Sequence, residues 1–188
     1  MRLSSKQTLL LLGLTGAGAA YLAANRFARQ PGIAPIASLD LPRYMGEWYE
    51  IARYPNRFEK DCTGFTTAHY SLQPDGSVRV VNRCRNPEGR FEQVVGTGRQ
   101  VGAADAATLE VRFAPGWLSL IPAVWADYWV IDIDPGYRLA AVSEPRGEYL
   151  WILARTPTVP KQEYAALLER LAQQGFDLSR LEMTRQTL

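Results

Sequence analysis

The feature that most constrains this chain is a series of eight short segments rich in β-branched and aromatic residues, which begins just after Gly46. Such residues favour strands. Turn signals separate the segments, among them Pro-Asp-Gly at 74–76 and Pro-Gly at 135–136, and no helical pattern lies between them. The predicted strands are Trp48–Tyr54, Phe65–Leu72, Ser77–Cys84, Phe91–Val101, Thr108–Phe113, Tyr128–Ile133, Tyr137–Ser143 and Tyr149–Arg155. This pattern predicts an all-β, antiparallel, up-and-down barrel of eight strands with room for one small ligand.

The pattern changes after the last strand, where a helix is expected. Thr158 is a candidate cap and Pro160 would lie in the first turn. Apolar residues then recur with helical spacing at Tyr164, Leu167, Leu168 and Leu171. Gly175 ends the run. We expect one amphipathic α-helix packed on the outside of the barrel.

The N-terminus differs in kind from the barrel segment. Residues 7–25 carry no charge and lie between Lys6 and Arg26, which is typical of a signal peptide and also near the length of a membrane-spanning helix. The sequence leaves a cleaved signal and a retained anchor equally open. It divides the chain into a hydrophobic N-terminal helix at 1–26, a proline-containing linker at 27–38 and a barrel domain at 39–188.

The excess positive charge belongs to this leader. The chain has 21 basic and 19 acidic residues, a net charge of +2. Residues 1–30 contain four basic residues and no acidic one, so the remainder has 17 basic and 19 acidic residues, a net charge of −2. A weakly acidic domain without a basic stripe excludes nucleic acid as a leading partner.

Cys62 and Cys84 are the only cysteines. In an exported chain a single pair indicates a disulfide, and two unrelated buried thiols are the alternative. No cluster of histidine, cysteine and carboxylate has the spacing of metal ligands. Neither a metal nor a cofactor is expected.

Two motifs resemble those of a known family. Gly46-Glu47-Trp48-Tyr49-Glu50-Ile51-Ala52-Arg53 is similar to the Gly-x-Trp signature that opens the first strand of lipocalins, and residues 149–157, Tyr-Leu-Trp-Ile-Leu-Ala-Arg-Thr-Pro, resemble their last-strand motif. The nearest subgroup is the bacterial lipocalins, related to apolipoprotein D and the temperature-induced lipocalins. The family's middle motif is poorly kept, with only Asp134 and Tyr137 near its position.

The resemblance implies that Gly46, Trp48 and Arg155 are structural residues that close the barrel, with the guanidinium packed on the tryptophan ring. Alternating strand directions place Trp48 and Arg155 at the closed end. The same count brings Cys62 and Cys84 together at the open end, which supports a disulfide between them.

Side-chain alternation from Trp48 and Arg155 predicts which residues face the interior. On the sixth strand the two faces are equally apolar, so the pair Tyr128 and Val130 is a choice over Trp129 and Ile131. The predicted ligand-contacting residues are Glu50, Ala52, Tyr54, Tyr128, Val130, Tyr149, Trp151 and Leu153.

A second candidate surface is the uncharged loop at residues 114–126, expected at the open end. Its large apolar residues are Trp117, Leu118, Leu120, Ile121 and Trp125. They would fold inward as a plug, form a lip through which a lipid enters from a membrane surface, or contact a second copy in a homodimer.

The resemblance implies that the protein binds a lipid, a fatty acid or lysophospholipid, for storage or transport in envelope maintenance. It would act in the periplasm or cell envelope, associated with the outer membrane, although no cysteine is available for N-terminal lipidation. We expect no enzyme: His69 is the single histidine, and Glu50 is the one carboxylate whose position would suit an acid or base. A lipocalin-fold enzyme and an envelope scaffold with a filled barrel are the alternatives.

Overall fold

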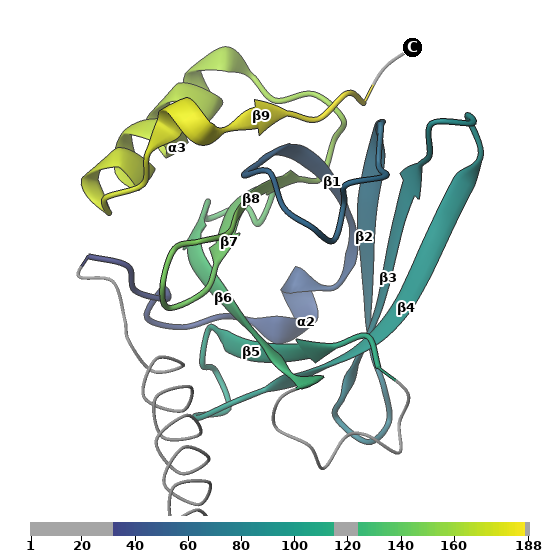
Figure 1. The fold of residues 1–188 in the computed structure, drawn as a ribbon. Coiled ribbons are helices and arrows are strands. Elements are labelled where there is room, and N and C mark those ends of the chain that lie inside the picture. The colour runs from purple at the N-terminus through teal and green to yellow at the C-terminus, as the bar shows by residue number, and fades with distance from the viewer. Residues whose placement is uncertain (1–31, 115–123, 187–188) are drawn as a thin grey trace, which may run out of the picture.

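The computed structural model describes residues 32–114 and 124–186 of the chain. Eight antiparallel strands form a closed barrel in sequence order, because β1 pairs with both β8 and β2 (Figure 1). The strands are β1 (Gly46–Arg53), β2 (Gly64–Leu72), β3 (Val78–Arg85), β4 (Phe91–Gln100), β5 (Thr108–Arg112), β6 (Ala126–Ile133), β7 (Leu139–Ser143) and β8 (Leu150–Ala154). The predicted barrel is confirmed.

Four further elements complete the fold, of which the sequence predicted only the long helix α3. They are α2 (Leu41–Tyr44), α3 (Lys161–Gln173), the 3-10 turn η3 (Leu178–Arg180) and β9 (Glu182–Met183), which pairs with β1. The residue before α3 is Pro160, which provides no side-chain cap. The prediction that Thr158 caps the helix is therefore wrong; its carbonyl instead accepts a hydrogen bond from Thr156 Oγ1.

Alternation along the strands separates two apolar clusters. The outer cluster lies between α3 and the wall formed by β6, β7 and β8 (Figure 1), and includes the fully buried Leu167 and Leu171. The inner cluster lines the barrel around Trp48. The predicted stripe on α3 is thus packing surface.

The segment expected to be a linker packs on the barrel where the structure describes it. Ile33 is buried in the outer cluster, and the Ile36 N–H donates to the Val130 carbonyl over 2.9 Å. Two isoleucines among prolines gave no periodic signal, although each finds a place in the packing.

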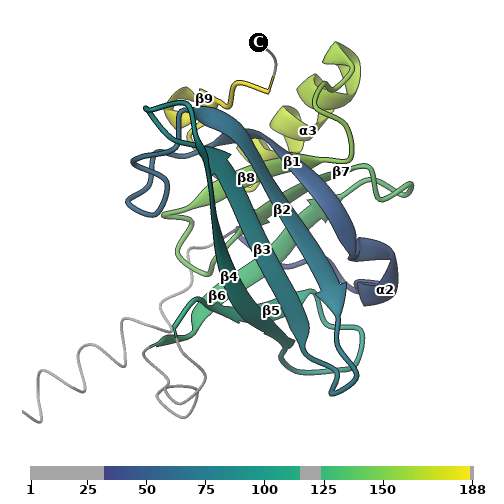
Figure 2. The same cartoon turned by 90° about the vertical axis from the view of Figure 1, so that its right-hand side faces the viewer.

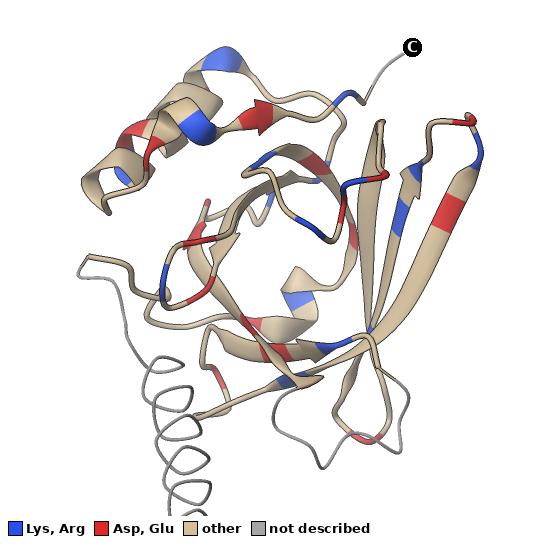
Figure 3. Cartoon of the chain, viewed as in Figure 1, with Lys and Arg blue, Asp and Glu red and all other residues tan. Residues whose placement is uncertain are grey.

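None of the helices within residues 32–114 and 124–186 is long and apolar enough to cross a membrane. The hydrophobic helix predicted at 1–26 lies outside the described residues. Over those that are described, Figure 3 shows basic and acidic residues interspersed along the ribbon, without a stripe of one sign.

Candidate functional site

The interior of the barrel is lined by residues from β6 and β8 that the alternation selected. Tyr128, Val130, Trp151 and Leu153 all pack in the inner cluster with Trp48. Tyr149 lies two residues before Trp151, and their rings stack with centroids 5.7 Å apart. The alternative pair on β6 faces outward, because Trp129 and Ile131 pack in the outer cluster.

The prediction for β1 is wrong beyond Glu50. A β-bulge shifts the register between Glu50 and Ala52, so that Glu50 is opposite Leu153 whereas Ala52 is opposite Ile152. One extra residue reverses the faces that follow it. Ala52 and Tyr54 therefore pack in the outer cluster, and Arg53 takes the inward position opposite Trp151. Sequence reasoning missed Arg53, because strict alternation contains no signal for a bulge.

The closed end is built around Arg155. Its guanidinium carbon lies 3.9 Å from the centroid of the Trp48 ring, so the packing implied by the resemblance is present. The same guanidinium donates to the carbonyls of Arg43, Tyr44, Glu47 and Tyr137 over 2.8–3.2 Å. Gly46 has φ +96°, and a Cβ there would lie 3.2 Å from Arg155 Nη1. Glycine is therefore needed at the start of the Gly-x-Trp motif for both backbone conformation and space.

Three tyrosine hydroxyls meet inside the barrel above this floor. Tyr128 Oη lies 2.7 Å from Tyr44 Oη and 2.9 Å from Tyr70 Oη. Burial raises the pKa of Tyr70 to about 12 and holds the pKa of Tyr44 and Tyr128 well above the ordinary value. All three are neutral, and their two mutual hydrogen bonds use two of three hydroxyl protons. One O–H therefore remains to donate to an acceptor outside this tyrosine group.

Two more polar atoms on the inner wall have no hydrogen-bond partner among the described residues. They are Thr66 Oγ1 on β2 and Asn82 Oδ1 on β3. Thr66 is 7% exposed, and Asn82 pairs with Ala68 of the inner cluster. Buried polar atoms are normally satisfied by protein, water or ligand. The wall of β2 and β3 thus offers hydrogen-bonding capacity that the chain does not use.

The open end carries a polar cluster, defined here as Glu50, Arg53, Glu59, Trp151 and Thr184. Arg53 Nη1 lies 2.9 Å from Glu50 Oε1, and Arg53 Nε lies 3.0 Å from Glu59 Oε2. Trp151 Nε1 donates to Glu59 Oε1 over 2.9 Å, and the Thr184 hydroxyl donates to Glu50 Oε1. Two carboxyl groups, of Glu50 and Glu59, share one guanidinium at the top of an otherwise apolar interior.

Glu50 is the titratable group that this cluster perturbs. Burial raises the pKa of its carboxyl to about 8 and the charge of Glu59 adds to the increase, whereas the Thr184 hydroxyl and Arg53 oppose it. The carboxyl is 3% exposed and already bonded to Arg53 and Thr184. These contacts favour a binding or structural role over proton transfer to a substrate.

The predicted disulfide is confirmed. Cys62 in the β1–β2 loop is bonded to Cys84 near the end of β3, with Cα atoms 5.6 Å apart. The disulfide attaches the β1–β2 loop, which contains Glu59, to the barrel wall. The covalent link therefore holds part of the polar cluster in place.

The mouth-loop prediction falls largely outside the described residues, because Trp117, Leu118, Leu120 and Ile121 lie between 115 and 123. Trp125 is buried, which fits the alternative in which these residues fold inward and does not fit an exposed lip. Trp125 is 7% exposed, and the guanidinium carbons of Arg99 and Arg112 lie 4.1 and 5.0 Å from its ring centroid.

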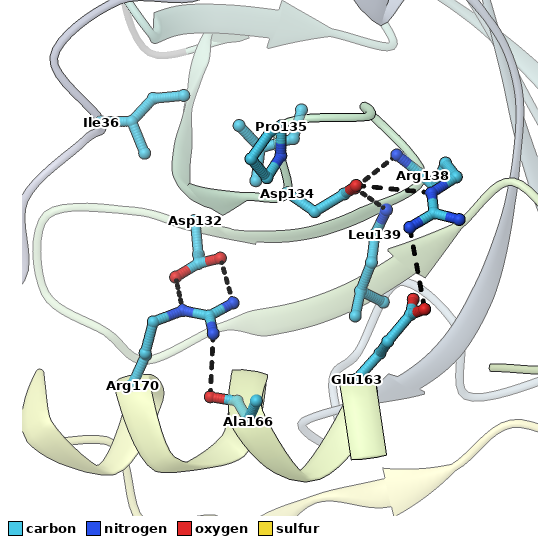
Figure 4. A pocket seen from close by; sticks show the side chains of 10 residues that line it. Ile36, Asp132, Asp134, Pro135, Arg138, Leu139, Glu163, Ala166 and Arg170 are labelled. Carbon is cyan, nitrogen blue, oxygen red and sulfur yellow. Dashed lines mark hydrogen bonds and ion pairs between the residues drawn. The ribbon is translucent and has the colours of Figure 1, made fainter. Parts of the chain in front are cut away.

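Two pockets open on the outer surface. The larger, about 490 Å³, lies between α3 and the β6–β7 turn (Figure 4). Its charged groups pair with one another: Arg170 binds both carboxylate oxygens of Asp132, and Arg138 lies between Asp134 and Glu163. This pocket is a packing seam rather than a ligand site. The smaller, about 400 Å³, lies over β1, β2 and β3 and includes the exposed His69.

The poorly kept middle motif forms a turn. Asp134 accepts hydrogen bonds from the N–H groups of Gly136, Arg138 and Leu139, which lower the pKa of its carboxyl against the opposing effect of burial. The Tyr137 hydroxyl accepts from the Asp40 N–H. No group of three potential metal ligands occurs within residues 32–114 and 124–186.

Comparison with known proteins adds independent findings. A family model described as a lipocalin-like domain matches residues 39–186. Temperature-induced lipocalin-1 of Arabidopsis thaliana is 39% identical over 81% of this chain and 82% of its own. The outer membrane lipoprotein Blc of Escherichia coli K12 is 37% identical over 91% of this chain and 94% of its own. Mouse apolipoprotein D is 33% identical over 79% of this chain and 78% of its own.

Solved structures show the same fold at lower identity. Insecticyanin from the tobacco hornworm superposes with a TM-score of 0.65 at 19% identity, covering 81% of this chain and 84% of its own. The cockroach allergen Per a 4 gives a TM-score of 0.64 at 21% identity, covering 86% and 96%. At these identities the likeness concerns the fold alone.

Proposed function

The chain belongs to the lipocalin family, and from that premise we propose that it binds a lipid, a fatty acid or lysophospholipid, inside its barrel. The observation that carries this proposal is the contrast within the interior. Apolar residues of the inner cluster surround the tyrosine group near the closed end, and the polar cluster lies at the open end. This order of surfaces matches an amphiphile with a long tail.

The apolar middle would hold the tail. Val80, Val130, Val142 and Leu153 contribute aliphatic surface to the inner cluster. Burial of a tail contributes about 0.8 kcal/mol per CH₂ group before the cost of ordering the chain. A tail of ordinary length therefore suffices for micromolar binding.

The polar atoms would fix the ligand's orientation. Arg53 and the Trp151 indole donate hydrogen bonds, and Glu50 and Glu59 accept them, at the end where a headgroup would emerge. Thr66 Oγ1 and Asn82 Oδ1 would satisfy a hydroxyl or ester group farther in. A few placed polar groups in an apolar site are the usual arrangement for orientation.

We place the protein in the cell envelope, at a membrane surface. Bacterial relatives are named outer membrane lipoproteins, and the sequence predicts an exported or anchored leader. The apolar residues between 115 and 123 would form the contact with the bilayer. This location would suit storage or transfer of envelope lipids.

The test compares two neighbouring residues of β2 that face opposite sides. Ala68 packs with the inner cluster, whereas Thr67 lines the outer pocket over β1, β2 and β3. Ala68→Phe should reduce binding of a fluorescent fatty acid and a fluorescent lysophosphatidylcholine at least about tenfold by filling the interior. Thr67→Phe is the control.

Equal binding by wild type and both variants would contradict the proposal. Native mass spectrometry of the full chain from its own membrane fraction should show a bound lipid that Ala68→Phe loses. The same spectrum reports whether the leader remains attached.

A further inference from the structure

The unpaired edge of β4 has no place in the lipid-binding proposal. β4 pairs with β3 from Phe91 to Gly98, but with β5 only from Thr97 onward. Within the described ranges no strand pairs with the other edge of Phe91–Val95, at the upper end of β4 in Figure 1. Unpaired edges are sites where another strand can add.

The alternation of hydrogen bonds shows which backbone groups face this edge. In the β3–β4 turn the Asn86 N–H donates to the Arg90 carbonyl. Along an antiparallel ladder, residue pairs that exchange backbone hydrogen bonds alternate with pairs that do not. After the Asn86–Arg90 pair, the hydrogen-bonded pairs are therefore Cys84 with Glu92 and Asn82 with Val94. The N–H and C=O groups of Phe91, Gln93 and Val95 therefore point away from β3. Thr97, next in this series, uses the same side to pair with Arg112 of β5.

Apolar side chains are exposed along the same segment. Phe91 is 50% exposed and Val95 48%, and both share the outer face with Gln93. Val94 is 55% exposed on the inner face. The segment has no proline, and its single charge, Glu92, accepts a hydrogen bond from Asn86 Nδ2. The usual devices that protect an edge from pairing are largely missing.

We infer that this edge pairs antiparallel with the same edge of a second copy, around a two-fold axis at Gln93. The register is self-complementary. Gln93 would be opposite Gln93 of the second copy, Phe91 opposite Val95, and Glu92 opposite Val94, so that no like charges meet. In each copy, the residues whose backbone groups point away from β3 are Phe91, Gln93 and Val95. All three would occupy hydrogen-bonded positions of the new ladder.

A second strand suits this edge better than a lipid surface does. A bilayer could cover Phe91 and Val95, but its hydrocarbon offers no partner for backbone N–H and C=O groups. An antiparallel strand supplies both kinds of contact. Because β4 begins at the end where Cys84 meets the β1–β2 loop, the pairing would bring the two open ends together.

Charge substitution at the axis is the sharpest test. In the full chain, studied in detergent by sedimentation over a range of concentrations, wild type should show a monomer–dimer equilibrium. Gln93→Lys and Gln93→Glu should each weaken it about tenfold, because like charges would be directly opposite. An equimolar mixture of the two variants should restore association, which also shows that both are folded. His69→Lys adds the same charge to the outer face away from the edge and should change nothing.

Cross-linking tests the register directly. Bonded antiparallel residues have Cα atoms about 5.5 Å apart, within the range of a disulfide. Gln93→Cys in the full chain should therefore form a cross-linked dimer under mild oxidation, and His69→Cys should not. A monomer at all concentrations, a dimer that both Gln93 variants leave intact, or equal cross-linking at the two positions would overturn the inference.

Discussion

Two partly buried arginines show how the ends of the barrel differ. Arg155 at the closed end lies on the Trp48 ring and donates to four backbone carbonyls. Arg53 at the open end is shared by the carboxylates of Glu50 and Glu59. The partners of Arg155 do not titrate near neutral pH, whereas one partner of Arg53 has its pKa raised to about 8. The closed end is held by contacts that do not vary with pH, and the open end by contacts that do.

The two ends also differ in what holds their residues in place. The floor is packed, with Trp48 fully buried and bonded through Nε1 to the Tyr44 carbonyl. The β1–β2 loop at the mouth has Phe58 62% exposed and relies on the disulfide at Cys62. This division suits a container, because a ligand must pass one end and be retained by the other.

The largest expected loss of stability comes from a substitution at the closed end. Trp48→Ala should lower the free energy of unfolding by about 3–5 kcal/mol, because it leaves a cavity in the inner cluster. Phe58→Ala, the aromatic control at the open end, should change it by less than about 0.5 kcal/mol. Urea unfolding measures both. Similar losses in the two variants would contradict the proposed difference.

Removing the disulfide should destabilise the open end. The Cys62→Ser, Cys84→Ser double variant should lose about 3 kcal/mol, because the unfolded chain is no longer restrained across a sequence separation of 22. Amide exchange should accelerate most in the β1–β2 loop and least at Trp48. Uniform acceleration would show that the mouth is not a separate unit of stability.

A smaller difference in stability is expected when one tyrosine hydroxyl is removed at each end. Tyr128→Phe should cost about 1–3 kcal/mol, because it leaves the buried hydroxyls of Tyr44 and Tyr70 without their shared partner. Tyr149→Phe near the mouth removes a hydroxyl for which the described structure shows no hydrogen bond, and should cost less than about 0.5 kcal/mol. Thermal melts of the two variants provide the measurement. An equal loss would argue against a hydrogen-bonded group at the floor.

The last expected effect, small over any single pH unit, is on pH dependence. Glu50 has an ordinary pKa of 4.5 in the unfolded chain and one of about 8 in the fold. Between these values the folded protein keeps a proton that the unfolded chain has released. The stability from this group is therefore complete below about pH 4.5 and is lost as the pH rises through about 8, with a slope of at most about 1.4 kcal/mol per pH unit.

Comparison with Glu50→Gln isolates this slope, because every other titrating group is retained. The difference in unfolding free energy between wild type and variant should shift against wild type as the pH rises across this window. Glu59→Gln should move the window to lower pH, since the charge of Glu59 helps to raise the pKa of Glu50. A constant difference would contradict the assignment.

The sequence predicted most of the barrel because its signals are local. Residue preference and turn chemistry located all eight strands, and helical spacing identified the face of α3 that contains Leu167 and Leu171. It missed β9, whose two residues carry no pattern and form a strand only because β1 has an edge to pair with. The role of Ile33 was missed for the same reason.

The inward-facing side chains were predicted correctly only where alternation is unbroken. The rows on β6 and β8 face inward as the pattern indicated, although the choice on β6 had no support in the sequence. On β1 the bulge after Glu50 turned Ala52 and Tyr54 outward and Arg53 inward. A bulge depends on how two strands are joined across the sheet, and one strand's sequence does not record it.

What the sequence determined by itself is the set of local and covalent features: the strands, the helix, the cysteine pair and the motifs around Trp48 and Arg155. What only the tertiary structure decided is which polar groups meet, such as Glu50 with Thr184 or Tyr128 with Tyr44 and Tyr70, and which edge of β4 is left unpaired. The physical reason is range. Propensity and periodicity act between near neighbours in the chain, whereas burial, pKa and edge pairing depend on residues that closure of the barrel brings together.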